Sequence, residues 1–325
     1  MRNGNGSAKP AAAPAASGEI AVEVEGLTKS FDGKVVVRNL TMRVRRGQIY
    51  GFLGPNGSGK TTTLRMLCGL LTPDSGHGTA LGYDILTQSE QIKVHVGYMT
   101  QRFSLYQDLS ILENLEFVAR MYSLPDPTKA AREAIAHLGL QGRETQLAGM
   151  LSGGWKQRLA LGACILPKPA LLLLDEPTAG VDPKPRREFW GEIHKLAADG
   201  MTVLVSTHYM DEAERCHEIA YIFNGNLIAR GTGDQVIAGS GLVTFEAEGP
   251  RADRLGRNLA GRPGIAMVAP FGTTLHVSGT DRRALEKAIE PFRRVPYRWV
   301  EVPPTLEDVF IHLMREAGGN GVKAA

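Results

Sequence analysis

The sequence predicts an α/β fold with a largely parallel sheet, followed by a small α+β module. The apolar run Ile49–Leu53 is followed directly by the glycine-rich stretch Gly54–Thr61 and a helical segment, an order typical of a phosphate-binding loop between a strand and a helix. Two further apolar runs, Leu171–Leu174 and Val203–Val205, are typical of strands buried on both faces of a parallel sheet. After a glycine-rich segment at 231–241 the pattern changes to short alternating elements, which predicts a boundary and a second module.

The first part of the chain predicts strands on either side of a tight turn. Val22–Val24 and Val35–Val37 flank the turn residues Asp32 and Gly33. After the glycine-rich loop and its helix, the segment 72–76 breaks the pattern. Residues Val94–Met99 then predict a short strand that leads to Gln101.

A helical block interrupts this α/β pattern between Ser104 and about Gly149. Ser110 and Glu113 have capping-box spacing at the start of one helix. A second helix is expected over Lys129–Leu138. Along one face of the first helix recur the apolar residues Ile111, Leu115, Val118 and Tyr122.

The C-terminal part predicts the order β-α-β-β-α-β-α, which suggests a small ferredoxin-like module. Residues 243–248 alternate as a strand does, Tyr297–Val302 forms another strand, and Thr305 with Asp308 caps a last helix. Another helix carries the stripe Leu285, Ala288, Ile289 and Phe292.

The composition excludes several classes of protein. A length of 325 residues fits one large domain or two of moderate size. The net charge of +3, with twelve basic and ten acidic residues after Ser240, argues against a nucleic-acid partner. Three scattered cysteines predict no disulfide framework or zinc site, and the short apolar runs predict no membrane-spanning segment. Residues 1–18 are expected to be a disordered tail, and 319–325 a flexible one.

The glycine-rich loop is the strongest chemical signal in the chain. Its glycines let the backbone N–H groups approach phosphates closely, Lys60 reaches the outer phosphates, and the Thr61 hydroxyl ligates Mg²⁺. A flexible glycine turn is the alternative, but it leaves the flanking strand and helix unexplained. The residues expected to bind the nucleotide are Gly54, Pro55, Asn56, Gly57, Ser58, Gly59, Lys60, Thr61 and Thr62.

Two adjacent carboxylates, Asp175 and Glu176, end the apolar run that starts at Leu171. The carboxyl ends of parallel strands are where open α/β sheets bind ligands. Asp175 is expected to orient Mg²⁺, and Glu176 to accept a proton from the water that attacks the γ-phosphate. The alternative, an ordinary polar strand end, loses weight beside a phosphate loop.

A third motif, Leu151-Ser152-Gly153-Gly154, opens a helix and resembles a second anion-binding loop. A chain with one phosphate loop needs a second one only if it serves a nucleotide on another copy. The simpler alternative is a helix N-cap made by Ser152.

Together these motifs resemble the ATP-binding subunit of an ABC transporter over about residues 20–239. Drug-exporter ATPases of the daunorubicin-resistance kind are the nearest resemblance, because they share the run Thr207–Glu214 and the ending Pro304–Phe310. The matching motifs are the phosphate loop, Gln101, Leu151–Gly154, Leu171–Glu176, Gly180-Val181-Asp182 and His208.

This resemblance implies an ABC ATPase core over 19–238, with a helical subdomain at about 102–160, and a C-terminal α+β module over 239–318. It also implies several roles. Phe31 stacks on adenine, Gln101 senses Mg²⁺ and the attacking water, His208 contacts the γ-phosphate, and Asp182 links two sites. Ser152, Gly153 and Gly154 close on ATP bound to the opposite subunit. For Phe31, a place in the core is the alternative. Trp155 departs from the family, where glutamine usually follows the glycines.

The implied function is ATP hydrolysis that powers a multidrug or small-molecule exporter at the cytoplasmic side of the membrane, with ATP and Mg²⁺ as cofactors. The implied partners are a second copy of the chain and a separate membrane permease. We expect the permease to contact the segment Arg102–Tyr106, although its side chains could instead fill the helical block. The alternative functions are a soluble ABC ATPase unconnected with transport, a phosphate-loop regulator or kinase, and an importer ATPase.

Overall fold

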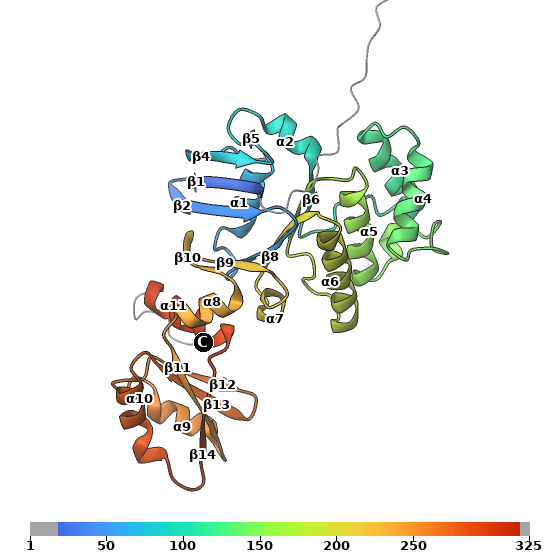
Figure 1. Cartoon of the computed structure of the whole chain (residues 1–325). Helices are drawn as coiled ribbons and strands as arrows, with labels where there is room; N and C mark the ends of the chain where they lie inside the picture. Colours follow the sequence, from blue (N-terminus) through green and yellow to red (C-terminus); the bar gives the residue numbers. More distant parts are fainter. Residues whose placement is uncertain (1–18, 319–325) are drawn as a thin grey trace, which may run out of the picture.

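The computed structural model describes residues 19–318, so the tails expected at 1–18 and 319–325 lie outside the described residues. Three sheets organise this part of the chain (Figure 1). The central sheet has six strands in the order β10-β9-β3-β8-β7-β6, and all but the edge strand β10 run parallel. Its strands are β3 (Ile49–Leu53), β6 (Val96–Met99), β7 (Leu171–Asp175), β8 (Thr202–Thr207), β9 (Glu218–Phe223) and β10 (Asn226–Gly231).

An antiparallel sheet in the order β2-β1-β4-β5 covers one side of the central sheet. The turn at Asp32 and Gly33, both with positive φ, joins its two long strands as expected. Buried side chains of this sheet and of α1 pack against β3, β7 and β8 in one cluster. The elements are β1 (Ile20–Phe31), β2 (Lys34–Arg45), α1 (Lys60–Leu67), β4 (Ser75–Ala80), β5 (Tyr83–Asp84) and α2 (Ser89–His95).

The strand expected over Val94–Met99 is shorter than the sequence pattern indicated. Val94 and His95 belong to α2, and β6 begins at Val96 because its partner β7 begins opposite it, at Leu171. Val94 is 60% exposed, whereas Val96 is buried.

A helical block covers the other face of the central sheet (Figure 1). The capping box of Ser110 and Glu113 is confirmed. On the apolar face that the sequence indicated, Ile111 and Leu115 are buried together with Ala119, whereas Tyr122 lies just beyond the helix and is exposed. The block consists of α3 (Ile111–Met121), α4 (Pro127–His137), η1 (Ala148–Met150) and α5 (Gly153–Ile165), and α6 (Pro183–Ala198) packs beside it.

The C-terminal sheet has the strand order β12-β13-β11-β14, and all its pairs are antiparallel. With the connection β-α-β-β-α-β this is the ferredoxin-like arrangement that the sequence predicted. Helices α9 and α10 cover one face of the sheet. The elements are β11 (Val243–Glu248), α9 (Ala252–Leu259), β12 (Met267–Phe271), β13 (Thr274–Gly279), α10 (Arg282–Ile289), η2 (Glu290–Phe292) and β14 (Arg298–Val302).

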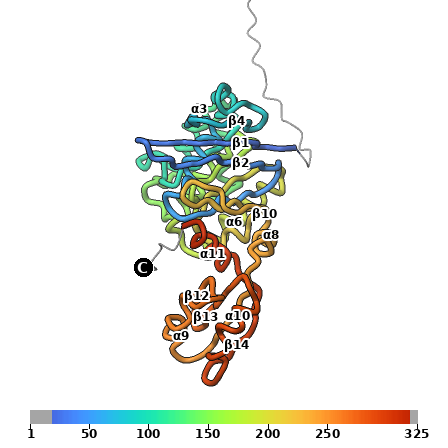
Figure 2. Tube along the Cα trace, turned by 90° about the vertical axis from the view of Figure 1, so that its left-hand side faces the viewer, coloured from blue at the N-terminus to red at the C-terminus, as the bar shows by residue number. Residues whose placement is uncertain are grey.

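Two helices join this module to the central sheet (Figures 1 and 2). The glycine-rich segment expected to be a boundary contains α8 (Gly233–Gly239), which begins with a capping box of Thr232 and Gln235. The last helix, α11 (Leu306–Gly318), is capped by Thr305 as predicted. It packs against α8 and β9, and short α7 (Met210–Ala213) lies in the same cluster.

Candidate nucleotide-binding and catalytic site

The predicted site residues follow the carboxyl ends of four neighbouring parallel strands. The phosphate loop follows β3, His208 follows β8, Asp175 ends β7, and Gln101 lies two residues beyond β6. Because β3, β8, β7 and β6 are adjacent in the sheet, these segments meet at one edge. This is where parallel α/β sheets bind ligands.

The phosphate loop has a backbone that two of its glycines make possible. Gly54 has a φ of 151°, and a Cβ there would lie 2.1 Å from the carbonyl oxygen of Ile222. Gly59 has a φ of 107°, and a Cβ would lie 2.7 Å from the carbonyl oxygen of Val36. Helix α1 starts immediately afterwards, so its N-terminal N–H groups face the loop, as in other anion-binding loops.

Lys60 is the buried cation of the site. Its Nζ donates hydrogen bonds to the carbonyl oxygens of Gly54 at 2.7 Å and Pro55 at 3.1 Å. It also lies 3.4 Å from Oε1 of Glu176. Burial lowers the pKa of the Lys60 ammonium, and the charge of Glu176 opposes that shift. The loop carbonyl groups hold the ammonium in place, and the charge of Glu176 offsets part of the effect of burial.

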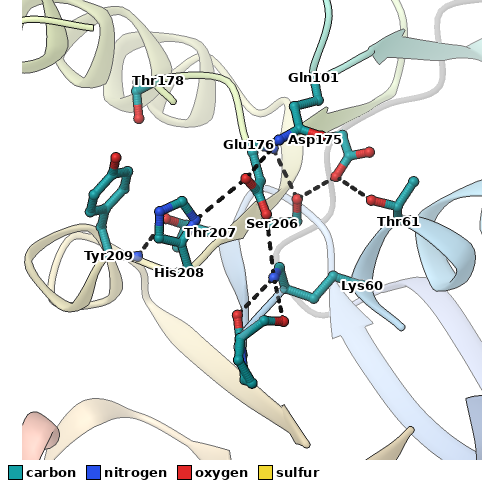
Figure 3. Close-up of polar contacts among 12 residues, drawn as sticks. Lys60, Thr61, Gln101, Asp175, Glu176, Thr178, Ser206, Thr207, His208 and Tyr209 are labelled. Carbon is teal, nitrogen blue, oxygen red and sulfur yellow. Dashed lines mark hydrogen bonds and ion pairs between the residues drawn. The ribbon is translucent and has the colours of Figure 1, made fainter. Parts of the chain in front are cut away.

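Glu176 is the meeting point of three polar side chains (Figure 3). Besides Lys60, Nε2 of Gln101 donates to Oε2 at 3.0 Å, and Nδ1 of His208 lies 3.4 Å from the same oxygen. Glu176 has a φ of 46°, a left-handed conformation that residues with a Cβ rarely adopt. This conformation takes Glu176 out of the line of strand β7 and into the pocket.

Asp175 has a different set of partners, all of them hydroxyl groups. Its Oδ1 accepts from Thr61 at 3.0 Å and from Ser206 at 2.6 Å (Figure 3). Its Oδ2 accepts from Tyr98 at 3.4 Å. Burial raises the pKa of Tyr98 to about 12, so this phenol keeps its proton and remains a donor.

The pocket suits a nucleotide with a magnesium ion. It has a volume of about 290 Å³, and the buried Oγ of Ser58 has no hydrogen-bond partner within residues 19–318. Thr61 and Asp175 supply the hard oxygen ligands that Mg²⁺ prefers beside phosphates. Within the same residues no cluster of three or more His, Cys, Asp or Glu side chains could hold a metal by itself. The pocket is lined by Val36, Asn56, Gly57, Ser58, Gly59, Lys60, Thr61, Thr62, Gln101 and Glu176.

Other predicted residues lie outside this lining. Phe31 is 45% exposed, so the alternative of a core aromatic is wrong. Ser152 and Asp182 are exposed at the N-terminal ends of α5 and α6. Ser152 is the N-cap residue of α5, as the simpler alternative expected, but its side chain makes no capping hydrogen bond to the described part of this helix. Gly153 is exposed, and Gly154 lies against Pro185.

Trp155 lies between two arginines on the helical block. The guanidinium carbons of Arg143 and Arg158 are 4.5 Å and 5.3 Å from its ring centroid, and the ring packs against the buried cluster of the block. Its neighbours in this chain are therefore cationic and apolar side chains of the helical block.

In the segment Arg102–Tyr106, one aromatic side chain fills the helical block and another is exposed, as a contact with a permease would require. Phe103 packs against the buried cluster of the helical block. Tyr106 is 53% exposed and meets Phe117 edge to face, with 5.2 Å between ring centroids.

Sequence reasoning missed several residues that shape the pocket. Ser206 and Tyr98 contact Asp175, and Val36 lines the pocket. Buried Glu212 accepts from the hydroxyls of Thr178 and of Thr207, which precedes His208. A signal was present for Ser206, because Ser206 and Thr207 are polar residues that end the otherwise apolar run from Val203.

Comparisons with known proteins identify a matching family model and several relatives. A family model described as ABC transporter matches residues 37–179. The probable multidrug ABC transporter ATP-binding protein YbhF of Escherichia coli is 44% identical over 227 residues, which cover 69% of this chain and 39% of that protein. This chain thus spans well under half the length of that relative.

Two further matches cover nearly the whole of the matched protein. Nod factor export ATP-binding protein I of Ralstonia nicotianae is 36% identical over 300 residues, or 90% of this chain and 93% of that protein. A solved dimeric ATP-binding cassette in a post-hydrolysis state, bound to ADP and Pi, has a TM-score of 0.60 at 26% identity. That match covers 65% of this chain and 98% of the other.

Proposed function

The chain belongs to the ABC transporter family, as an ATP-binding protein with an ABC ATPase domain, and we propose that it hydrolyses ATP to drive export through a separate membrane permease. The observation that carries this proposal is the convergence of Lys60, Gln101 and His208 on Glu176, at the edge of the sheet where the phosphate loop also lies.

In this mechanism the phosphate loop holds the triphosphate and Lys60 exchanges its loop carbonyls for phosphate oxygens. Glu176 accepts the proton of the attacking water, which Gln101 and His208 orient. The transferred phosphoryl group needs little covalent help, so positioning and charge neutralisation supply most of the rate. Mg²⁺, held by Thr61 and Asp175 with Gln101 nearby, would neutralise charge on the outer phosphates when bound.

A second copy of the chain would complete each site. Ser152, Gly153 and Asp182 are exposed away from the pocket of their own chain, where a nucleotide bound to a facing copy could meet them. Gly154 would belong to the same surface, and Phe31 would stack on adenine from its exposed position. The dimeric state of a solved relative supports this arrangement.

The names of two relatives support a proposal for the permease and the cargo. The printed names of two relatives refer to multidrug transport and Nod factor export, so we propose export of small organic molecules. The chain would then lie at the cytoplasmic side of the membrane, bound to its permease through the surface around Tyr106. Within residues 19–318, none of the helices combines the length and the apolar character needed to cross a bilayer.

The test is the substitution Glu176→Gln. It removes the proton acceptor but keeps the side-chain shape, so hydrolysis should fall about a hundredfold or more. ATP binding should persist, and an ATP-dependent dimer should accumulate in size-exclusion chromatography. As a control, Lys60→Ala should weaken nucleotide binding itself. Near-normal turnover by Glu176→Gln would refute the assigned base.

The coupling to transport needs a separate measurement. Purification of the full chain from membranes should recover an integral membrane protein in stoichiometric amount. A chain that stays monomeric under every nucleotide condition, and still hydrolyses ATP at full rate without a membrane partner, would contradict the proposal.

A further inference from the structure

Ser206 is a buried residue that forms hydrogen bonds with both Asp175 and Glu176. It lies in β8, is fully buried, and pairs with Asp175 across the β7–β8 ladder. Its Oγ donates a hydrogen bond to Oδ1 of Asp175 at 2.6 Å and accepts one from the backbone N–H of Glu176 at 2.9 Å (Figure 3). One hydroxyl group therefore touches both residues.

The backbone of Glu176 needs such a support. A residue with a Cβ and a φ of 46° is held in a conformation that costs free energy and persists only where surrounding contacts determine it. The N–H of Glu176 also donates to the carbonyl oxygen of Ser206 at 3.1 Å. Both acceptors of this N–H thus belong to Ser206, and they hold the turn that aims the Glu176 carboxylate at Lys60 and Gln101.

The support for Asp175 is independent of the phosphate loop. Thr61 also donates to Oδ1, but Thr61 lies in α1 directly beyond the loop and would turn to the ligand. Ser206 lies in a central strand, so its hydrogen bond keeps the carboxylate oriented whatever Thr61 contacts. Ser206 has no exposed surface and does not line the pocket, so its contacts with the site run through Asp175 and Glu176.

We propose that Ser206 is a positioning residue for ATP hydrolysis, which acts by aiming Glu176 and orienting Asp175. This inference rests on the proposed function, because it assigns these two carboxylates to the reaction. The matched position for comparison is Thr202, at the other end of the same strand. Thr202 is 1% exposed, and its hydroxyl accepts a hydrogen bond from the N–H of Gly47 at 3.1 Å, away from the pocket.

The experiment compares Ser206→Ala with Thr202→Val in the full chain. Each variant removes one buried hydroxyl from β8, so both should lower thermal stability. Only Ser206→Ala should lower kcat, by about ten- to a hundredfold, because a lost hydrogen bond to a charged group and a released turn misplace the base. The affinity for ATP measured in EDTA should stay within about twofold of the wild type.

A second readout does not depend on turnover. Addition of Mg²⁺ should tighten ATP binding less in Ser206→Ala than in the wild type, because the Asp175 carboxylate is no longer oriented. Thr202→Val should keep the full effect of Mg²⁺. If Ser206→Ala does not fold, Ser206→Cys carries the same expectations, since a thiol has similar volume but donates only weakly.

Equal kcat in Ser206→Ala and Thr202→Val would overturn the inference, as would an unchanged effect of Mg²⁺. The proposed function fails in a different way, namely if the wild-type chain itself neither binds nor hydrolyses ATP. The two failures are therefore distinguishable within one set of measurements.

Discussion

Adjacent carboxylates acquire different environments here because the chain changes conformation between them. Asp175 keeps the extended backbone of β7 and faces three hydroxyl groups, whereas Glu176 has a positive φ and faces an ammonium, an amide and an imidazole. Hydroxyl groups orient a carboxylate without neutralising it, which suits a metal ligand. The three polar side chains around Glu176 are those that the proposed mechanism uses to hold the phosphates and orient water.

Burial also changes the ionisation of a side chain outside the pocket. Cys68, at the end of α1, is 2% exposed, and burial raises the pKa of its thiol from 9.0 to about 11. Between these values the unfolded chain loses the proton and the folded chain keeps it. This contribution to stability is therefore complete below pH 9 and is lost as the pH rises toward 11.

We expect the substitution Cys68→Ala to make stability less sensitive to alkaline pH. The gap in unfolding free energy between wild type and variant should shrink by up to about 2 kcal/mol as the pH rises from 8 to 11. Urea denaturation across this range measures it. The control is Val96→Ala in the same buried cluster, whose gap should not depend on pH. A constant gap for Cys68→Ala would contradict the prediction.

At the scale of elements, the loops around the site are connected by the short helix α7. Its Glu212 has no exposed surface and accepts hydrogen bonds from Thr178 and, at 2.6 Å, from Thr207. Thr178 lies just after Glu176 and Thr207 just before His208. The guanidinium Nε of Arg186, in α6, lies 3.9 Å from the same carboxylate. Through these contacts the buried side chain of Glu212 connects the segments that follow β7 and end β8 with helices α6 and α7.

Removal of this carboxylate by Glu212→Ala should destabilise the fold by about 2–4 kcal/mol, because it leaves the buried hydroxyl groups of Thr178 and Thr207 without their acceptor. Chemical denaturation is the measurement. Asp211→Ala is the control, since this neighbour is 58% exposed and lies at the same 3.9 Å distance from Arg186. It should change stability by less than about 0.5 kcal/mol. A loss of stability in Glu212→Ala no larger than that in Asp211→Ala would contradict this prediction.

At the scale of the whole molecule, helix α11 connects the central sheet with the C-terminal sheet (Figure 2). Phe310 of α11 is buried and stacks on Tyr221 of β9, with 4.0 Å between ring centroids. On the other side, Asp308 is bonded at 3.1 Å to His276, which projects from β13 on the face opposite α9 and α10. Helix α11 thus returns to the central sheet after the C-terminal sheet is complete.

The substitution Phe310→Ala should loosen this connection and cost about 3–5 kcal/mol. In hydrogen exchange, protection should fall first in β9, α8 and α11, which share one buried cluster. Leu285→Ala, in the separate cluster of the C-terminal module, should instead affect β11–β14. Indistinguishable exchange patterns in the two variants would mean that the clusters unfold as one unit.

Much of the site could be predicted from the sequence, because its main residues follow strands with strong local signals. The glycines of the phosphate loop, the capping box at Ser110 and the apolar run before Asp175 are all patterns between neighbours in the chain. Errors occurred where neighbours in space decide the outcome. The strand expected from Val94 begins only at Val96, opposite the start of its partner β7.

By itself the sequence determined the kinds of elements and the positions of the phosphate loop, the paired carboxylates and the second glycine motif, since periodicity, glycine and capping act over a few residues. Only the tertiary structure decided that β8 lies between β3 and β7, that Ser206 meets Asp175, and that α11 returns to β9. Strand order and long-range contacts depend on how distant faces pack together, and no short stretch of chain carries that information.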